Sequence, residues 1–281
     1  MIISFQTNSC SLDAQRQVGS TMDNLNRSIA RLSSGYRISN AGDDAVGLAV
    51  SENLRTQIRS MAQAKRNAMD GMSMVQSAEG SLNEVSNILI RMRELSMQSA
   101  SDAIGTNERG YLQIEFSALQ SEIDRLANAT EFNGQFLING AFSIDSNALA
   151  FQVGIRNVST CDRIAITIPS ATTAAFNIES TTTSISQKTG AQAALGGLDN
   201  ALQALNTVRA RLGTLENRLN VTISALTPMH DNLVTANSLI RETDVAEETG
   251  NMTKQQVMLQ AGTAILAQAN TVPQLVLRLL Q

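Results

Sequence analysis

Residues 18–32 read VGSTMDNLNRSIARL. Aliphatic side chains recur in this stretch at alternating steps of four and three residues: Val18, Met22, Leu25, Ile29 and Leu32. Such a seam is typical of a helix that packs lengthwise against another helix. The same spacing resumes from about residue 45 to residue 100, over 112–126 and over 198–226. We therefore predict a mainly α protein, with long antiparallel coiled-coil helices from both ends of the chain.

The first seam stops at a segment rich in helix-breaking residues. Gly35, Gly42 and Gly47 lie there with asparagine and aspartate among them, a composition that favours a bend. We predict a linker at this point. In the second half of the chain, Pro228 is expected to kink or end the long helix because proline removes a backbone donor. The nearby His230 is expected in a loop.

The middle of the chain changes to a period of two. Phe151, Val153 and Ile155 alternate with smaller or polar residues, and a second alternating run covers 164–168. Asn133-Gly134 and Asn139-Gly140 are dipeptides typical of hairpin turns. These features predict a small β-hairpin region from about 132 to 170, followed by a loop from Thr172 to Ser186.

Composition excludes several classes of function. The 281 residues carry a net charge of -4, which is unlike a nucleic-acid binder. One histidine and two distant cysteines, Cys10 and Cys161, cannot form a clustered zinc site, so both are predicted to be free thiols without a role. No P-loop, HExxH or GxSxG motif occurs, and no apolar run is long enough to span a membrane. We expect no enzyme, no metal, no cofactor and no signal peptide.

The apolar C-terminal tail leaves two interpretations open. An ordinary intramolecular bundle would use the seams as its core. Residues 272–280, however, are apolar nearly all round, although a chain end normally lies in water. Burial of this tail requires a partner, and self-association would supply one.

Seven short blocks carry a more specific signal. They are LSSG (32–35), DDAVGLAV (43–50), MRELSMQSA (92–100), EFNG (131–134), DVAEE (244–248), QAG (260–262) and ILAQANTVPQ (265–274). In this order they resemble the N-terminal and C-terminal signatures of bacterial flagellin. The resemblance covers about residues 1–140 and 190–281. It implies a short flagellin that lacks the large variable outer domains.

The resemblance also implies a domain organisation. Residues 1–44 and 236–281 would be the two halves of an inner-tube coiled-coil domain. Residues 45–130 and 191–235 would form the outer-tube helices, with the β-hairpin and loop region at 131–190. In such proteins the paired chain ends are disordered in the free monomer, so folding and assembly would be coupled.

Site residues follow from the seams and from the resemblance. The expected inner-tube assembly residues are Val18, Met22, Leu25, Ile29, Leu32, Ile265, Leu266, Val276, Leu279 and Leu280. Gly35, Gly42 and Gly47 are expected to form an interdomain hinge. By the resemblance, Arg91, Leu95 and Glu115 occupy positions that meet the Toll-like receptor for flagellin.

The implied function is a structural subunit that polymerises into the flagellar filament for swimming motility. Implied partners are further copies of the chain, flagellar cap and hook-associated proteins, and the flagellar type III export apparatus with its chaperone. The chain would be secreted and extracellular. A hook–filament junction protein or another coiled-coil axial protein is the alternative.

Overall fold

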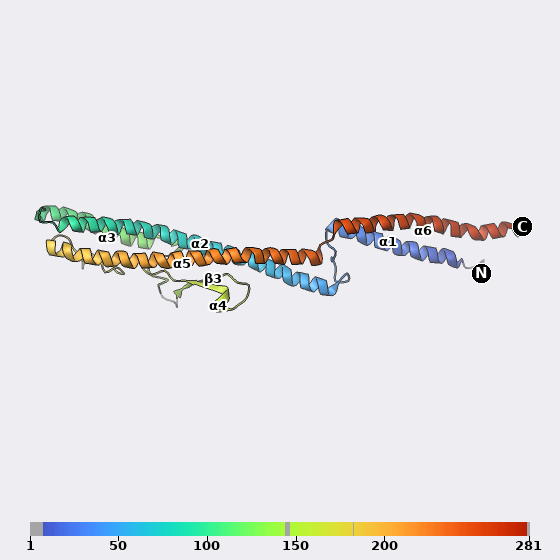
Figure 1. The fold of residues 1–281 in the computed structure, drawn as a ribbon, viewed down its shortest axis with the longest axis horizontal. Helices are drawn as coiled ribbons and strands as arrows, with labels where there is room; N and C mark the ends of the chain where they lie inside the picture. The colour runs from blue at the N-terminus through green and yellow to red at the C-terminus, as the bar shows by residue number, and fades with distance from the viewer. Residues whose placement is uncertain (1–7, 144–146, 182, 280–281) are drawn as a thin grey trace. The chain divides into compact units, whose positions relative to one another are not determined.

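The computed structural model describes residues 8–143, 147–181 and 183–279, with side chains up to Thr271. Five long helices dominate: α1 (Ser9–Ser34), α2 (Ala45–Ser99), α3 (Thr106–Ala129), α5 (Lys188–Arg241) and α6 (Val245–Leu279) (Figure 1). The mainly α prediction is confirmed.

The chain divides into two compact units, each described here by itself. The terminal unit comprises the described residues of 1–58 and 231–281, and the middle unit comprises those of 59–230. The terminal unit is therefore built from both ends of the chain, with the whole middle unit inserted between its halves.

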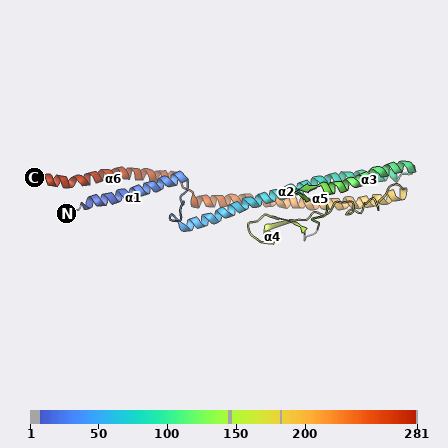
Figure 2. The same ribbon diagram turned by 180° about the vertical axis from the view of Figure 1, so that it is seen from behind.

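In the terminal unit, α1 lies lengthwise along α6 (Figures 1 and 2). The side chain of Asn8 caps the start of α1 by accepting a hydrogen bond from the Ser11 amide at 3.2 Å. Asn8 also donates to the Ala269 carbonyl at 2.9 Å, so the same residue ties α1 to α6. The face of α1 turned inward is narrow, since only Thr21, Leu25 and Ser28 are buried on this helix.

In the middle unit, α2, α3 and α5 lie side by side around one aliphatic core (Figures 1 and 2). The seam of α5 is buried along its length, at Ala191, Ala194, Leu198, Ala201, Leu205, Val208, Leu212, Leu215, Leu219 and Leu226. On α3, Phe116 and Ile123 are completely buried against it. Three helical faces thus supply a core that needs almost no aromatic residues.

The β region consists of two separate antiparallel pairs. Strand β1 (Glu131–Phe132) pairs with β2 (Gln135–Phe136) through a turn in which Asn133 and Gly134 both have positive φ, as a type I′ hairpin requires. Strand β3 (Leu149–Gln152) pairs with β4 (Arg163–Ile166), after the short helix α4 (Ser159–Asp162). The small β-hairpin region is confirmed, but Asn139-Gly140 joins no pair of strands.

The segment after the β region is less open than the sequence suggested. It contains no helix or strand among its described residues up to Gln187. Phe176, Ile178 and Ile185 are nevertheless buried in the core of the middle unit. Apolar residues spaced without a regular period therefore anchor a segment that has no regular secondary structure.

Pro228 was expected to kink or end the helix, and the second of these is wrong because α5 continues to Arg241. Proline removes one N–H group and so one hydrogen bond of the ladder. The apolar seam remains buried up to Leu226, on the turn before the proline, and this packing holds the helix across the defect. His230 accordingly lies in the helix, half-buried, and not in a loop.

Candidate assembly interface

The seam of α1 is divided between a covered and an exposed row. Leu25 is buried against α6, and Val18 and Leu32 are half-buried. Met22 and Ile29 remain 45% and 46% exposed. One row therefore holds the two helices together, while the other offers aliphatic surface to a further partner.

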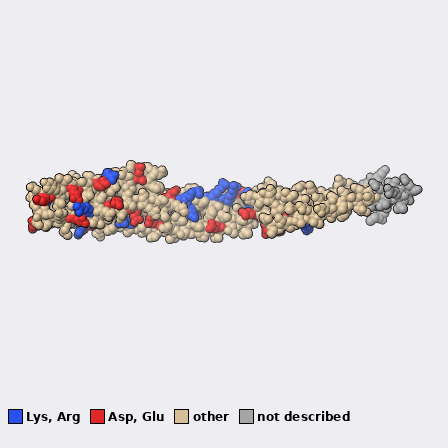
Figure 3. Space-filling view, turned by 90° about the horizontal axis from the view of Figure 1, so that it is seen from above, with Lys and Arg blue, Asp and Glu red and all other residues tan. Residues whose placement is uncertain are grey.

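Helix α6 offers a similar surface. Ile265 is 62% exposed and Leu266 is half-buried. The predicted contacts at Val276, Leu279 and Leu280 lie outside the described side chains. No charged residue occurs from Gln255 to Leu277. On the face drawn in Figure 3, the part of the terminal unit formed by α1 and α6 shows few charged side chains. The surface is aliphatic and nearly neutral.

One contact sets how closely α1 and α6 approach. A Cβ atom added at Gly262 would lie 2.8 Å from Cγ2 of Val18, closer than side-chain carbons pack. The glycine therefore provides a hole for the valine side chain. The heptad spacing places Val18 in the seam but does not indicate its partner, because a lone glycine on a helix has no distinctive pattern.

Backbone hydrogen bonds join the linker after α1 to the end of α5 and the segment before α6. We call this contact the tied junction. The Arg37 amide donates to the Arg241 carbonyl at 2.8 Å, and the Thr243 amide donates to the Gly35 carbonyl at 3.0 Å. The Arg241 guanidinium lies 5.0 Å from the centre of the Tyr36 ring and 2.5 Å from Oε1 of Glu52. These residues were missed from sequence, since their partners are some 200 positions away along the chain.

The three glycines assigned to the hinge occupy different local environments. Gly35 is left-handed, with φ at 73°, and caps α1 by donating to the Arg31 carbonyl. Gly42 lies in an open turn with no heavy atom near its missing side chain. Gly47 lies within α2, where an added Cβ would meet the side chains of Asp44 and Ile38 at 2.4 and 2.7 Å. Only the first two belong to the linker itself.

Substitution by alanine is expected to have different effects at Gly35 and at Gly42. Gly35→Ala forces an L side chain into the left-handed region, and we expect it to destabilise the terminal unit by about 1–2 kcal/mol. The matched control, Gly42→Ala, has no such strain and is expected to be neutral or slightly stabilising. The melting temperature of assembled filaments measures both. Equal melting temperatures for the two variants would contradict this assignment.

Two carboxylates of the junction have lowered pKa values. Backbone N–H groups of Asn40 and Ser39 stabilise the anion of Asp43 and lower its pKa. A hydrogen bond from Arg241 lowers the pKa of Glu52 in the same way. A carboxylate with a depressed folded-state pKa stabilises the fold above its unfolded pKa, and this stability is lost as pH falls through the folded value.

The junction is therefore expected to loosen in acid, below about pH 4. Hydrogen exchange of the 36–44 peptide in assembled filaments, corrected for intrinsic rates, measures the loss. Glu52→Gln should reduce protection already at neutral pH and flatten the acid dependence. Glu84→Gln, another exposed glutamate of α2, is the matched control and should behave as wild type. Unchanged protection of wild type from pH 7 to 3 would refute the expectation.

The three residues assigned to receptor contact lie together on α2 and α3. Nη2 of Arg91 is 2.8 Å from Oε1 of Glu115, and both side chains are about half exposed. That ion pair raises the pKa of Arg91. Leu95 is only 1% exposed and belongs to the core.

The described residues contain no cluster of three or more potential metal ligands among His, Cys, Asp and Glu. Cys10 and Cys161 are free thiols, as predicted, but both are exposed and not packed or semi-exposed as expected. Within the same described part of the chain, no helix is long and apolar enough to cross a membrane.

Comparison with known proteins identifies the class. Residues 5–143 match the model for the bacterial flagellin N-terminal helical region, and residues 195–280 match that for the C-terminal helical region. The chain belongs to the bacterial flagellin family, whose members are structural subunits of the flagellar filament.

Individual relatives agree along nearly the whole chain. The flagellar filament 33 kDa core protein of Treponema phagedenis is 39% identical over 98% of both chains. A flagellin of Halalkalibacterium halodurans is 39% identical over 96% of this chain and 97% of its own. A solved Vibrio parahaemolyticus flagellar structure, described as hook-associated, gives a TM-score of 0.58 at 15% identity over 71% of this chain and 99% of its own, which supports the fold alone. No finding favours the hook–filament junction alternative.

Proposed function

We propose that this flagellin is exported through the flagellar type III apparatus and polymerises outside the cell. The terminal unit would form the inner tube, and the helices and β pairs of the middle unit would form the wall around it. An export chaperone, the flagellar cap and hook-associated proteins would be its transient or terminal partners. The family supports this division of roles.

The observation that carries the proposal is the exposed aliphatic row of the terminal unit. Met22, Ile29 and Ile265 are each exposed by 45% or more. Full burial of such a side chain stabilises by about 1.5–3 kcal/mol. A lone chain does not gain this energy, whereas neighbouring copies that cover the row do.

The same proposal includes bending at the linker. Gly35 and Gly42 lie between α1 and α2 and would allow different angles in different subunits, while the crowded Gly47 would fix the start of α2. Normal filament assembly and swimming by both Gly42→Val and Gly47→Val would remove this part of the proposal.

Recognition by the Toll-like receptor for flagellin is a further part of the proposal. The exposed Arg91–Glu115 pair is the group a receptor would touch, and the buried Leu95 would support it from below. Receptor-reporter cells treated with monomer should respond less to Arg91→Ala than to wild type. No signal from wild type at high dose would remove this claim.

Seeded polymerisation tests the main proposal. Purified monomer mixed with filament fragments should elongate them into long helical filaments in electron micrographs. Limited proteolysis of the same monomer should remove the chain ends and leave a fragment near residues 59–230. Met22→Ser combined with Ile29→Ser should abolish elongation without altering that fragment. Closed rings, or no polymer at all, would contradict a propagating subunit.

A further inference from the structure

Helices α1 and α6 run antiparallel in the terminal unit. At one level Val18 lies against Gly262, and at another Nη1 of Arg31 lies 3.8 Å from Oε2 of Glu248. A step forward along α1 is therefore matched by a step back along α6. This register fixes which residues of the two helices lie at the same level.

Two exposed methionines share such a level. Met22 comes one turn after Val18 on α1, and Met258 comes one turn before Gly262 on α6. They are 45% and 41% exposed. The described part of the terminal unit holds one other methionine, Met252, which is half-buried. We refer to Met22 and Met258 as the methionine pair.

The surface around the methionine pair is aliphatic. Val257, the residue before Met258, is 59% exposed, and Ile29 on the same row of α1 as Met22 is 46% exposed. Helix α6 carries no charged residue from Gln255 to Leu277. Burial of an unpaired polar group costs free energy, so this surface can be covered by a neighbour only while it stays apolar.

The methionine thioether can be made polar by a mild reaction. A hydroperoxide transfers one oxygen atom to the sulfur: the S–O bond forms as the O–O bond breaks, and the sulfur loses two electrons. The departing oxygen takes up the proton and leaves as water or an alcohol. The product, methionine sulfoxide, is polar, and methionine sulfoxide reductases convert it back to the thioether.

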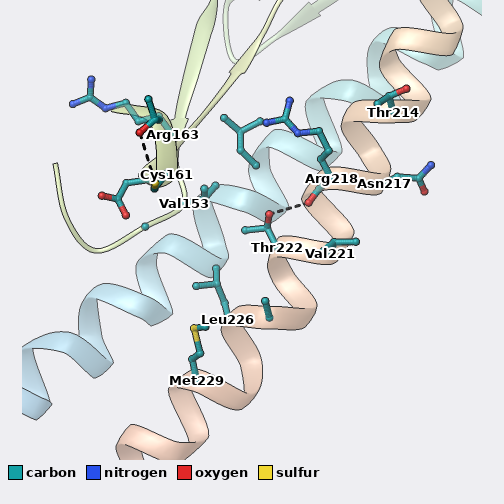
Figure 4. A pocket seen from close by; sticks show the side chains of 15 residues that line it. Val153, Cys161, Arg163, Thr214, Asn217, Arg218, Val221, Thr222, Leu226 and Met229 are labelled. Carbon is teal, nitrogen blue, oxygen red and sulfur yellow. Dashed lines mark hydrogen bonds between the residues drawn. The ribbon is translucent and has the colours of Figure 1, made fainter. Parts of the chain in front are cut away.

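The exposed methionines of the middle unit have charged neighbours. Met229 is 53% exposed and lines a groove of about 780 Å³ that Arg218 also lines (Figure 4). Met97 is 55% exposed and lies in a hollow with Arg93 and Glu94. A sulfoxide oxygen at either position joins a surface that already holds charged groups, so these residues serve as controls.

We propose that the methionine pair is an oxidation site at which a hydroperoxide reversibly blocks polymerisation of the free subunit. Sulfoxide oxygens at Met22 and Met258 place two unpaired acceptors at one level of the surface that neighbouring copies bury. Sulfoxide reductases remove both oxygens and restore the apolar surface. The inference rests on the proposed filament function, because the site acts only through that surface.

Seeded polymerisation of oxidised monomer tests the proposal. A Cys10→Ser, Cys161→Ser background removes the two free thiols, which the same oxidant would attack. Monomer is treated with hydrogen peroxide, catalase removes the excess, and peptide mapping measures sulfoxide at each methionine. Oxidation should raise the monomer concentration that remains after elongation about tenfold or more, since burial of one methionine side chain is worth about that factor. The two stereospecific sulfoxide reductases should reverse the change.

Leucine substitutions assign the effect to particular residues. Leucine nearly conserves the volume of methionine and has no sulfur to oxidise. Met22→Leu combined with Met258→Leu should elongate seeds normally after peroxide treatment. The matched control, Met97→Leu combined with Met229→Leu, should be blocked as strongly as the background. Equal block of both double variants would overturn the proposal.

Partly oxidised monomer without leucine substitutions gives a second measurement, which does not depend on how leucine packs. After elongation, sulfoxide at Met22 and Met258 should be depleted from pelleted filaments relative to sulfoxide at Met97. Equal partition of all three sulfoxides would contradict the assignment, as would a methionine pair that stays reduced while Met97 is oxidised. Failure of untreated monomer to elongate seeds would instead count against the filament function itself.

Discussion

Gly262→Val is expected to abolish filament formation. The position already lies so close to Val18 that a single added carbon would be 2.8 Å from its methyl group. A valine adds two further carbons, and overpacking of this kind costs about 1–3 kcal/mol and pushes helices apart. Since α1 and α6 together form the proposed assembly surface, their separation would displace the exposed rows of both helices. Seeded polymerisation followed by light scattering measures the loss.

The control uses another glycine of the same helix. Gly250→Val introduces the same side chain on α6 at a position with no heavy atom within 4 Å of the added Cβ, and it should polymerise nearly as wild type. Relief of the clash supplies a second check. Gly262→Ala adds only the crowded Cβ atom and should also reduce assembly. If the contact with Val18 is the cause, the second substitution Val18→Ala should restore assembly to this variant. Equal loss of polymerisation in Gly262→Val and Gly250→Val would show that the contact with Val18 is not the cause.

Phe116→Ala is expected to give the largest loss of stability in the middle unit. Phe116 is completely buried among the aliphatic side chains of α2, α3 and α5. Removal of a buried phenyl ring typically costs about 3–5 kcal/mol. For a unit of this size that corresponds to a fall in melting temperature of about 6 to 20 °C. Thermal unfolding of monomer, followed by circular dichroism, measures it.

Ile114→Ala is the matched control, two positions away on the same helix but 68% exposed. We expect a change within about 0.5 kcal/mol in the monomer. A large drop in the melting temperature of this monomer would show that the exposed side of α3 is also part of the folded core.

The helices were predictable because their seams repeat over many turns. The rows of α2 and α5 contain enough aliphatic residues at steps of three and four to exclude any other period. The turn at Asn133-Gly134 was also predictable from local sequence, because both residues tolerate positive φ. These features depend on neighbours in the sequence, and single-sequence reasoning identifies them.

Features that depend on distant partners were missed or misjudged. Pro228 was expected to disturb α5, but the burial of Leu226 beside it comes from packing against other segments. The division of the α1 seam into a covered Leu25 and an exposed Met22 depends on where α6 lies. The tied junction around Arg241 joins residues some 200 positions apart. No local pattern marks such contacts.

The insertion of the middle unit between the two halves of the terminal unit dictates an order of events. If the chain is exported as proposed, one of the helices α1 and α6 emerges long before the other, whichever terminus leads. Residues 59–230 have all their partners within one continuous stretch and can fold as soon as they are free. The pair of α1 and α6 can form only when both helices are available. Under that proposal, each subunit would complete its assembly surface only after both α1 and α6 have been exported, which would oppose premature aggregation.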